Sequence, residues 1–140
     1  MAFYPYLFFG RDCREAFEFY KQVFGGELTL ITMKEMPSSD QPVPADQGDL
    51  IAHAALTFDD DQLLMGSDDP TTDTPGPVTG MMVNYSVPDV DAATKAFNTL
   101  AEGGEVRMQI GPTDWSPAFG MCVDRFGTPW MVSGDPTDSS

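Results

Sequence analysis

The chain has 140 residues and an acidic composition, with 7 Lys and Arg against 22 Asp and Glu and a formal net charge of −15 at pH 7. This charge argues against nucleic acid as a partner, because such binding rests on neutralising phosphates with Lys and Arg. The length is typical of one domain with its own core, so we expect residues 1–140 to form a single domain. The two cysteines, Cys13 and Cys122, lack the spacing of a disulfide framework or a zinc site.

The sequence contains no recognisable signal for export or membrane insertion. Residues 1–5 lack the basic region of a signal peptide. No apolar run approaches the roughly 18 residues that a membrane span requires. We therefore expect a cytoplasmic protein with no membrane partner.

The first half of the chain predicts a strand, a helix and three further strands. Residues 4–9 are aromatic and apolar, which is typical of a short strand. Asp12 offers an N-cap with Glu15 three residues later, and the apolar residues that follow at helical spacing predict a helix ending at Gly25-Gly26. The three further strands are predicted at residues 27–34, 50–58 and 62–67.

The second half of the chain predicts the same order of elements. Asp89 opens a predicted helix that runs to about Glu102. By the spacing of apolar residues we expect Tyr20, Phe97 and Trp130 in the core. The predicted strands of this half are residues 81–87, 105–110, 118–123 and 129–133.

The two halves indicate an internal repeat. Asp12 and Asp89 lie 77 positions apart, and the two Gly-Gly pairs lie 78 positions apart. The fold class is therefore α+β, with two β-α-β-β-β units at about 3–67 and 80–133, a linker at 68–79 and a frayed tail at 134–140. Because each unit has a helix on only one face of its sheet, we expect the two units to form an open barrel-like cup. Concave surfaces of this kind bind small molecules.

The opening and closing residues match motifs of a known family. The chain has Pro-Tyr-Leu-Phe-Phe at 5–9, Ala-Phe-Glu-Phe-Tyr at 16–20, Phe-Gly-Gly at 24–26 and Asp-Arg-Phe-Gly-Thr-Pro-Trp-Met-Val at 124–132. With its two units, the chain resembles the vicinal oxygen chelate superfamily, which includes glyoxalase I, extradiol dioxygenases and the bleomycin and fosfomycin resistance proteins. Within that superfamily it is similar to the PhnB-like branch. The resemblance implies a glyoxalase-like fold, which hosts many chemistries.

The resemblance also implies metal-ligand positions on the first and last strands of each unit, and the chain departs from the family pattern there. These positions fall near Pro5, Met65, Met82 and Met131, and none carries the imidazole or carboxylate that such divalent ions require. Thioethers suit copper(I), which is one alternative. Methionine more often fills apolar space, so we predict a cup without metal or other cofactor for a small apolar or aromatic molecule.

We predict that the ligand-binding cup is lined by residues of both units. His53, the only histidine, is either a general base or a strand histidine with one hydrogen-bond partner. Its face depends on strand register, which the sequence does not reveal. Trp115 either closes over a ligand or fastens its loop to the sheet. The predicted cup residues are Leu7, Phe9, His53, Met65, Met82, Asn84, Trp115 and Met131.

Three functions are compatible with these residues, and the sequence leaves open whether the protein is an enzyme. The first is a binding protein for a small molecule. The second is a divalent-metal-dependent glyoxalase-like lyase or dioxygenase, with a displaced metal site at His53 and a carboxylate such as Glu35 or Asp49. The third is a drug-sequestering protein of the resistance type. The family resemblance further implies a homodimer.

Overall fold

The computed structural model describes residues 3–35, 47–58, 62–69 and 80–134. The chain divides into two compact units, Met1–Pro75 and Gly76–Ser140. The predicted linker after Asp69 and the predicted tail after Gly134 lie outside the described residues. Within the described residues, no helix is long and apolar enough to cross a membrane.

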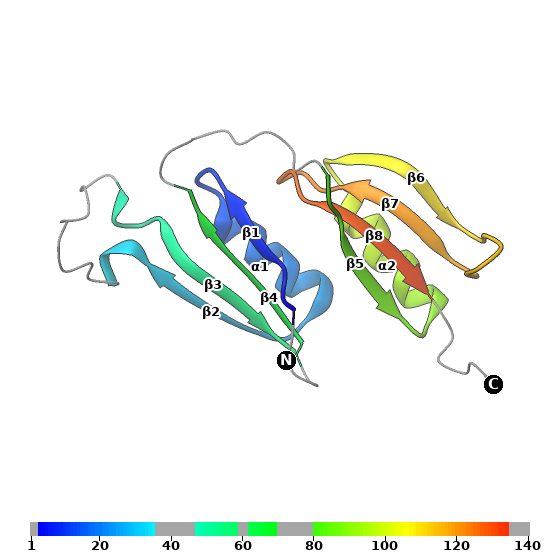
Figure 1. Cartoon of the computed structure of the whole chain (residues 1–140), viewed down its shortest axis with the longest axis horizontal. Coiled ribbons are helices and arrows are strands. Elements are labelled where there is room, and N and C mark those ends of the chain that lie inside the picture. Colours follow the sequence, from blue (N-terminus) through cyan, green and yellow to red (C-terminus); the bar gives the residue numbers. More distant parts are fainter. Residues whose placement is uncertain (1–2, 36–46, 59–61, 70–79, 135–140) are drawn as a thin grey trace. The chain divides into compact units, whose positions relative to one another are not determined.

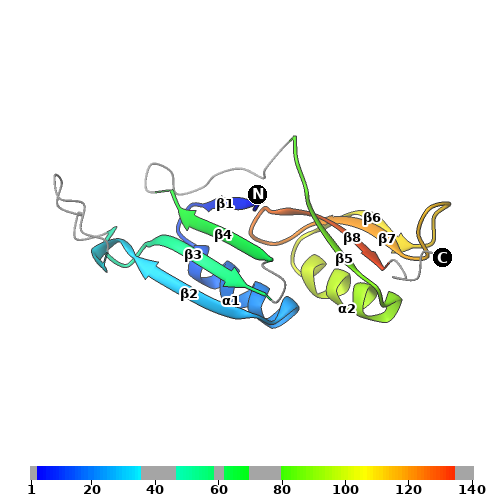
Figure 2. The ribbon, with the colours of Figure 1, turned by 60° about the horizontal axis from the view of Figure 1, so that its bottom comes forward.

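The first unit forms a four-stranded sheet with one helix. Its strands have the order β1-β4-β3-β2, in which β1 pairs parallel with β4 and the other neighbours are antiparallel. Helix α1 lies against one face of this sheet (Figures 1 and 2). Its elements are β1 (Tyr6–Phe9), α1 (Cys13–Phe24), β2 (Glu27–Thr32), the 3-10 turn η1 (Met33–Glu35), β3 (Ile51–Thr57) and β4 (Leu63–Asp68).

The second unit repeats this arrangement. Its strands have the order β5-β8-β7-β6, again with a parallel pair, β5 and β8, and helix α2 lies against one face (Figure 1). Its elements are β5 (Val83–Val87), α2 (Val90–Ala101), β6 (Glu105–Gly111), β7 (Phe119–Val123) and β8 (Pro129–Gly134). The predicted α+β class with two β-α-β-β-β units is confirmed.

The core of each unit lies between the helix and its sheet. In the first unit, Phe17 and Tyr20 of α1 are fully buried and meet edge to face, with ring centroids 5.5 Å apart. Phe9 of β1 lies 6.0 Å from Phe17 between ring centroids. In the second unit, Phe97 of α2 and Trp130 of β8 are buried. The predicted core positions of Tyr20, Phe97 and Trp130 are thus confirmed.

The two helices begin in different ways, although an Asp precedes each. Asp89 caps α2, because its Oδ1 accepts a hydrogen bond of 2.9 Å from the backbone N–H of Asp91. The Asp12 side chain makes no such cap bond at the start of α1. The predicted capping box of Asp12 and Glu15 is therefore wrong.

A buried carboxylate from the sheet takes over the cap of α1. Asp68, at the end of β4, is 4% exposed. Its Oδ1 accepts a hydrogen bond of 2.9 Å from the N–H of Cys13, the first helical residue, and its Oδ2 accepts one of 2.8 Å from the N–H of Ile51 in β3. The negative charge is favourable at a helix N-terminus. Asp68 thereby ties β4, β3 and α1 together.

Candidate functional site

The sheet of the first unit has a second face, opposite α1, which we call the helix-free face of the first sheet. In β1, Leu7 and Phe9 are buried, whereas Tyr6 is 36% and Phe8 59% exposed. Tyr6 stands opposite Met65 of β4, and Met65 stands opposite Ala55 of β3. Because side chains alternate along each strand, this face is formed by Tyr6, Phe8, His53, Ala55, Met65 and Ser67.

His53 lies on the helix-free face because β3 alternates regularly from His53 to Thr57, and an irregularity interrupts the strand only beyond His53. Between Ile31 and Thr32 of β2, the register shifts so that β3 advances by two residues, from His53 to Ile51. Ile51 and Ala54 are both buried, at 1% and 0% exposure, although strict alternation would send residues three apart to opposite faces. The extra residue in β3 is a β-bulge, which re-aims the side chains beside it. His53 pairs with Ile31 in the regular register, so alternation with Ala54 and Ala55 decides its face, and the bulge redirects Ile51 instead. The predicted turn at residues 59–61 lies outside the described residues.

His53 forms a pair with Tyr6 across the intervening strand β4. The Tyr6 phenol oxygen lies 3.2 Å from His53 Nδ1, and the two ring centroids are 5.8 Å apart. The ring of Phe8 lies 5.2 Å from that of Tyr6 between centroids. This face therefore combines aromatic surface with one imidazole–phenol hydrogen bond. A bond of this kind agrees with both predicted roles of His53, so its role as a base stays a prediction.

Leu7 and Phe9, which we predicted in the cup, instead face α1. Leu7 is 5% and Phe9 2% exposed, and Phe9 packs against Phe17 of the helix. The residues of β1 on the opposite face are Tyr6 and Phe8. The sequence could not separate the two sets, because all four residues of the strand are apolar or aromatic.

The helix-free face of the second sheet, opposite α2, carries a row of methionines. Asn84 of β5 stands opposite Met131 of β8, Met131 opposite Met121 of β7, and Met121 opposite Met108 of β6. The three methionines are partly exposed and Asn84 is exposed. Asn84 and Met131 were predicted as cup residues. Met108 and Met121 were missed, because strand pairing brings them into the row.

Trp115 and Met82 complete the predicted residues of the second unit. Trp115 is 70% exposed, and its ring meets that of Phe119 edge to face at 5.6 Å between centroids. This contact supports the interpretation that Trp115 fastens its loop to the sheet, and closure over a ligand stays a prediction. Met82 lies just before β5 and is partly exposed.

Comparison with known proteins decides the family. Residues 4–132 match the Glyoxalase/Bleomycin resistance protein/Dioxygenase superfamily. The chain belongs to this superfamily. The match spans both β-α-β-β-β units, in agreement with the resemblance seen in the motifs.

Relatives of the chain match it over nearly its full length. Protein YjdN from Escherichia coli (strain K12) is 28% identical over 141 residues, which cover 95% of each chain. The crystal structure of protein PA1353 from Pseudomonas aeruginosa is 41% identical, with a TM-score of 0.81 over 97% of this chain and 98% of that one. The PhnB protein from Bacillus cereus is 21% identical, with a TM-score of 0.70 over 95% and 98% of the two chains. At 21% identity, the last likeness shows the fold alone.

In the described part of the chain, the residues on the first and last strands of each unit do not match a divalent-metal site. No three His, Cys, Asp or Glu side chains of the described ranges lie together so that they could hold a metal ion. The paired residues of the first and last strands are Tyr6 with Met65, and Asn84 with Met131. A phenol, two thioethers and an amide differ from the imidazole and carboxylate set that such ions prefer.

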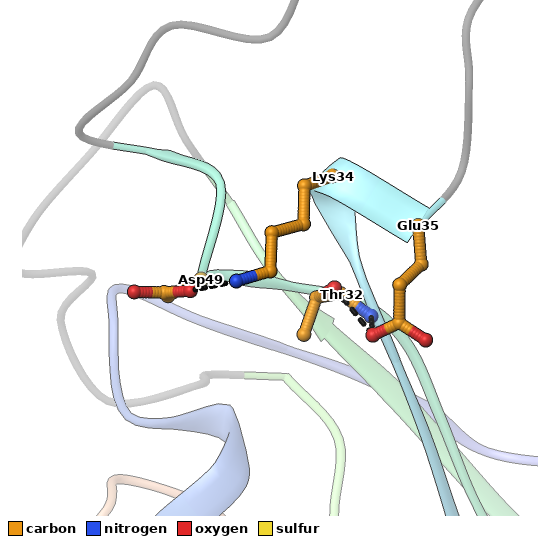
Figure 3. A network of polar contacts seen from close by, with 4 residues as sticks. All are labelled: Thr32, Lys34, Glu35 and Asp49. Carbon is orange, nitrogen blue, oxygen red and sulfur yellow. Dashed lines mark hydrogen bonds and ion pairs between the residues drawn. The ribbon is translucent and has the colours of Figure 1, made fainter.

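The carboxylates of the predicted displaced metal site are engaged elsewhere (Figure 3). Glu35 accepts hydrogen bonds from Thr32, of 2.6 Å from Oγ1 and 3.3 Å from the N–H, and Asp49 pairs with Lys34 Nζ at 2.9 Å. These hydrogen bonds lower the pKa of both carboxyl groups, and the bond to Asp49 raises the pKa of Lys34. Glu35 and Asp49 form no three-ligand group with His53 among the described residues.

Neither cysteine is suited to act as a nucleophile. Cys13 and Cys122 are fully buried. Burial, together with the charge of Asp124, raises the pKa of Cys122 to about 11. Burial and the charge of Asp68 also raise the pKa of Cys13. Because the thiolate is the reactive form, both thiols should be inert near neutral pH.

The raised thiol pKa values predict a loss of stability in alkali. An unfolded thiol ionises near its ordinary pKa of 9.0, whereas folded Cys122 keeps its proton up to about pH 11. The unfolded state therefore loses protons first, and the free energy of unfolding should fall as the pH rises through this window. Urea unfolding of wild type and Cys122→Ala at pH 7, 9 and 10.5 tests this. The variant should lose less stability between pH 9 and 10.5, and equal losses would contradict the prediction.

Proposed function

We propose that this protein is a PhnB-like member of the superfamily that binds a small apolar or aromatic molecule without a resident metal. We further propose that it works as a homodimer in the cytoplasm. The PhnB-like assignment is supported by the opening and closing motifs and by the fold shared with the Bacillus cereus protein. The observation on which the binding function rests is the helix-free face of the first sheet, which presents Tyr6 and Phe8 beside Met65.

The chemistry of this face suits an aromatic ligand. Phe8 is 59% and Tyr6 36% exposed, and their rings lie together, so a ligand ring that covers them removes apolar surface from water. A contact between two aromatic rings adds about 0.5–1.5 kcal/mol of binding free energy beyond the contribution of the buried apolar area. The thioether of Met65 is flexible and polarizable, which favours contact with rings of varied shape. The methionine row of the second sheet offers contacts of the same kind.

The binding proposal predicts that loss of the Phe8 ring weakens the binding of an aromatic ligand. We expect Phe8→Ser to weaken binding of the neutral fluorescent probe N-phenylnaphthylamine about tenfold, because one ring contact and its buried area are worth about 1.4 kcal/mol. Fluorescence titration of the full chain measures the dissociation constant. The matched control is Phe3→Ser, because Phe3 is 92% exposed and precedes the sheet. The control should bind within about twofold of wild type.

The same preparation tests the other parts of the proposal. Elemental analysis of untagged protein should find far less than one divalent ion per chain, and native mass spectrometry should find dimers. One divalent ion per chain would overturn the metal-free part. Equal weakening by Phe8→Ser and Phe3→Ser, or no probe binding by wild type, would overturn the assignment of the binding face.

A further inference from the structure

We propose that Tyr6 and His53 form a metal-free acid–base pair that interconverts the keto and enol forms of a small aromatic ketone. This inference rests on the proposed function, because the helix-free face of the first sheet must first bind the aromatic part of the molecule. It goes beyond that function by assigning a reaction and two catalytic residues.

The hydrogen bond between the two side chains makes the pair bifunctional. A neutral imidazole has one nitrogen that donates and one that accepts. If the Tyr6 hydroxyl donates to His53 Nδ1, the remaining groups are the Nε2–H donor and the lone pairs of the phenol oxygen. If His53 Nδ1–H donates to the phenol oxygen, the remaining groups are the Tyr6 O–H donor and the Nε2 acceptor. The 3.2 Å contact between the phenol oxygen and Nδ1 fits either arrangement, and each offers one donor and one acceptor to a ligand.

Keto–enol conversion requires one group that removes a proton and one that supplies a proton. The reaction starts from the arrangement in which His53 Nδ1–H donates to the phenol oxygen. His53 Nε2 takes a proton from the carbon beside the carbonyl, and the electron pair of that C–H bond forms the C=C bond. The carbonyl oxygen takes the Tyr6 hydroxyl proton as the C=O π bond opens to C–O–H. The proton on His53 Nδ1 then passes to the phenolate oxygen. The product is the enol. The pair ends in the arrangement in which Tyr6 donates to His53 Nδ1 and Nε2 carries the proton, and the reverse reaction starts from there.

The surroundings of the pair are suited to such a substrate. Tyr6 is 36% exposed and His53 partly exposed, so a small molecule can reach both groups. The Phe8 ring, 5.2 Å from that of Tyr6, and Met65 opposite Tyr6 offer apolar contacts for the aromatic ring. The pair therefore lies at a polar point within an apolar face, as a ligand with one ring and one carbonyl requires.

The test follows proton exchange on a neutral aromatic ketone, phenylacetone, in heavy water. Enolisation removes a methylene proton, and the return to the ketone adds a deuteron from the solvent. The loss of the proton signal is measured by NMR with the full chain. Wild type should accelerate exchange above buffer. Since a positioned acid or base contributes about 10²-fold or more, Tyr6→Phe and His53→Gln should each lower the accelerated rate about 10²-fold. The matched control is Tyr4→Phe, at a tyrosine 39% exposed outside the strands, which should keep the wild-type rate.

Binding of N-phenylnaphthylamine separates this proposal from the one on which it rests. Tyr6→Phe and His53→Gln keep the apolar contacts, so each should bind the probe within about threefold of wild type. If wild type binds the probe but does not accelerate exchange, or if Tyr4→Phe lowers the rate as much as Tyr6→Phe, the acid–base proposal is overturned and the binding function stands. If wild type neither binds the probe nor accelerates exchange, both are overturned.

Discussion

Replacing Gly104 with alanine should lower the free energy of unfolding by about 3 kcal/mol or more, because a side chain at this position has no space. A Cβ at Gly104 would overlap the carbonyl oxygen of Val123 and lie 2.8 Å from the carbonyl carbon of Asp124. Both obstacles are backbone, and Val123 pairs with Glu105 in the sheet, so rotation of a side chain cannot relieve the overlap. Urea unfolding followed by circular dichroism measures the loss.

Gly111→Ala is the matched control for this prediction. A Cβ at Gly111 would meet no atom within 4 Å, and the residue has no left-handed backbone conformation. The control should therefore unfold within about 0.5 kcal/mol of wild type. If Gly104→Ala were as stable as Gly111→Ala, the close approach of the start of β6 to the end of β7 would not require a glycine at position 104.

The same constraint explains why a Gly-Gly pair follows the helix in both units. The first glycine of each pair, Gly25 and Gly103, has a left-handed φ of 78° and 74°. The second glycine of each pair lies against the backbone of the neighbouring strand. A Cβ at Gly26 would lie 2.7 Å from the carbonyl oxygen of Thr57, and a Cβ at Gly104 would overlap the carbonyl oxygen of Val123. The repeat in the sequence therefore reflects two separate steric requirements in each unit.

Asp68→Ala should destabilise the first unit by about 3 kcal/mol, because it leaves two buried backbone N–H groups without their acceptor. The carboxylate accepts from Cys13 at the start of α1 and from Ile51 in β3. Asp89→Ala is the comparison, since Asp89 caps α2 through one exposed hydrogen bond and its loss should cost about 1 kcal/mol. Urea unfolding of both variants measures the difference. Equal losses would contradict the role of Asp68 as the buried tie between helix and sheet.

Local signals in the sequence predicted the elements of both units. Apolar spacing placed the helices and strands within about two residues of their observed bounds and placed Tyr20, Phe97 and Trp130 in the core. Helix-capping signals were less reliable. Asp12 and Asp89 occupy equivalent places in the repeat, yet only α2 is capped by its own Asp. For α1, the acceptor comes from Asp68, which is 55 residues away from Cys13 in the sequence.

The candidate site was predicted less completely than the fold. Met65, Asn84 and Met131 lie on the helix-free faces, whereas Leu7 and Phe9 lie in the core. Residues 6–9 are apolar or aromatic on both faces, so no local pattern could distinguish them. The partnership of Tyr6 with His53 crosses an intervening strand and had no sequence signal.

The amino-acid sequence alone determined the family, the internal repeat and the position of each helix and strand, because these depend on local spacing and on motifs within one segment. The tertiary structure decided which residues face away from the helices. That choice depends on the register between strands far apart in the chain, and a single extra residue in β3 turns Ile51 to the same buried face as Ala54. The Tyr6–His53 pair and the row of Met108, Met121 and Met131 exist only because pairing joins separate strands into a sheet.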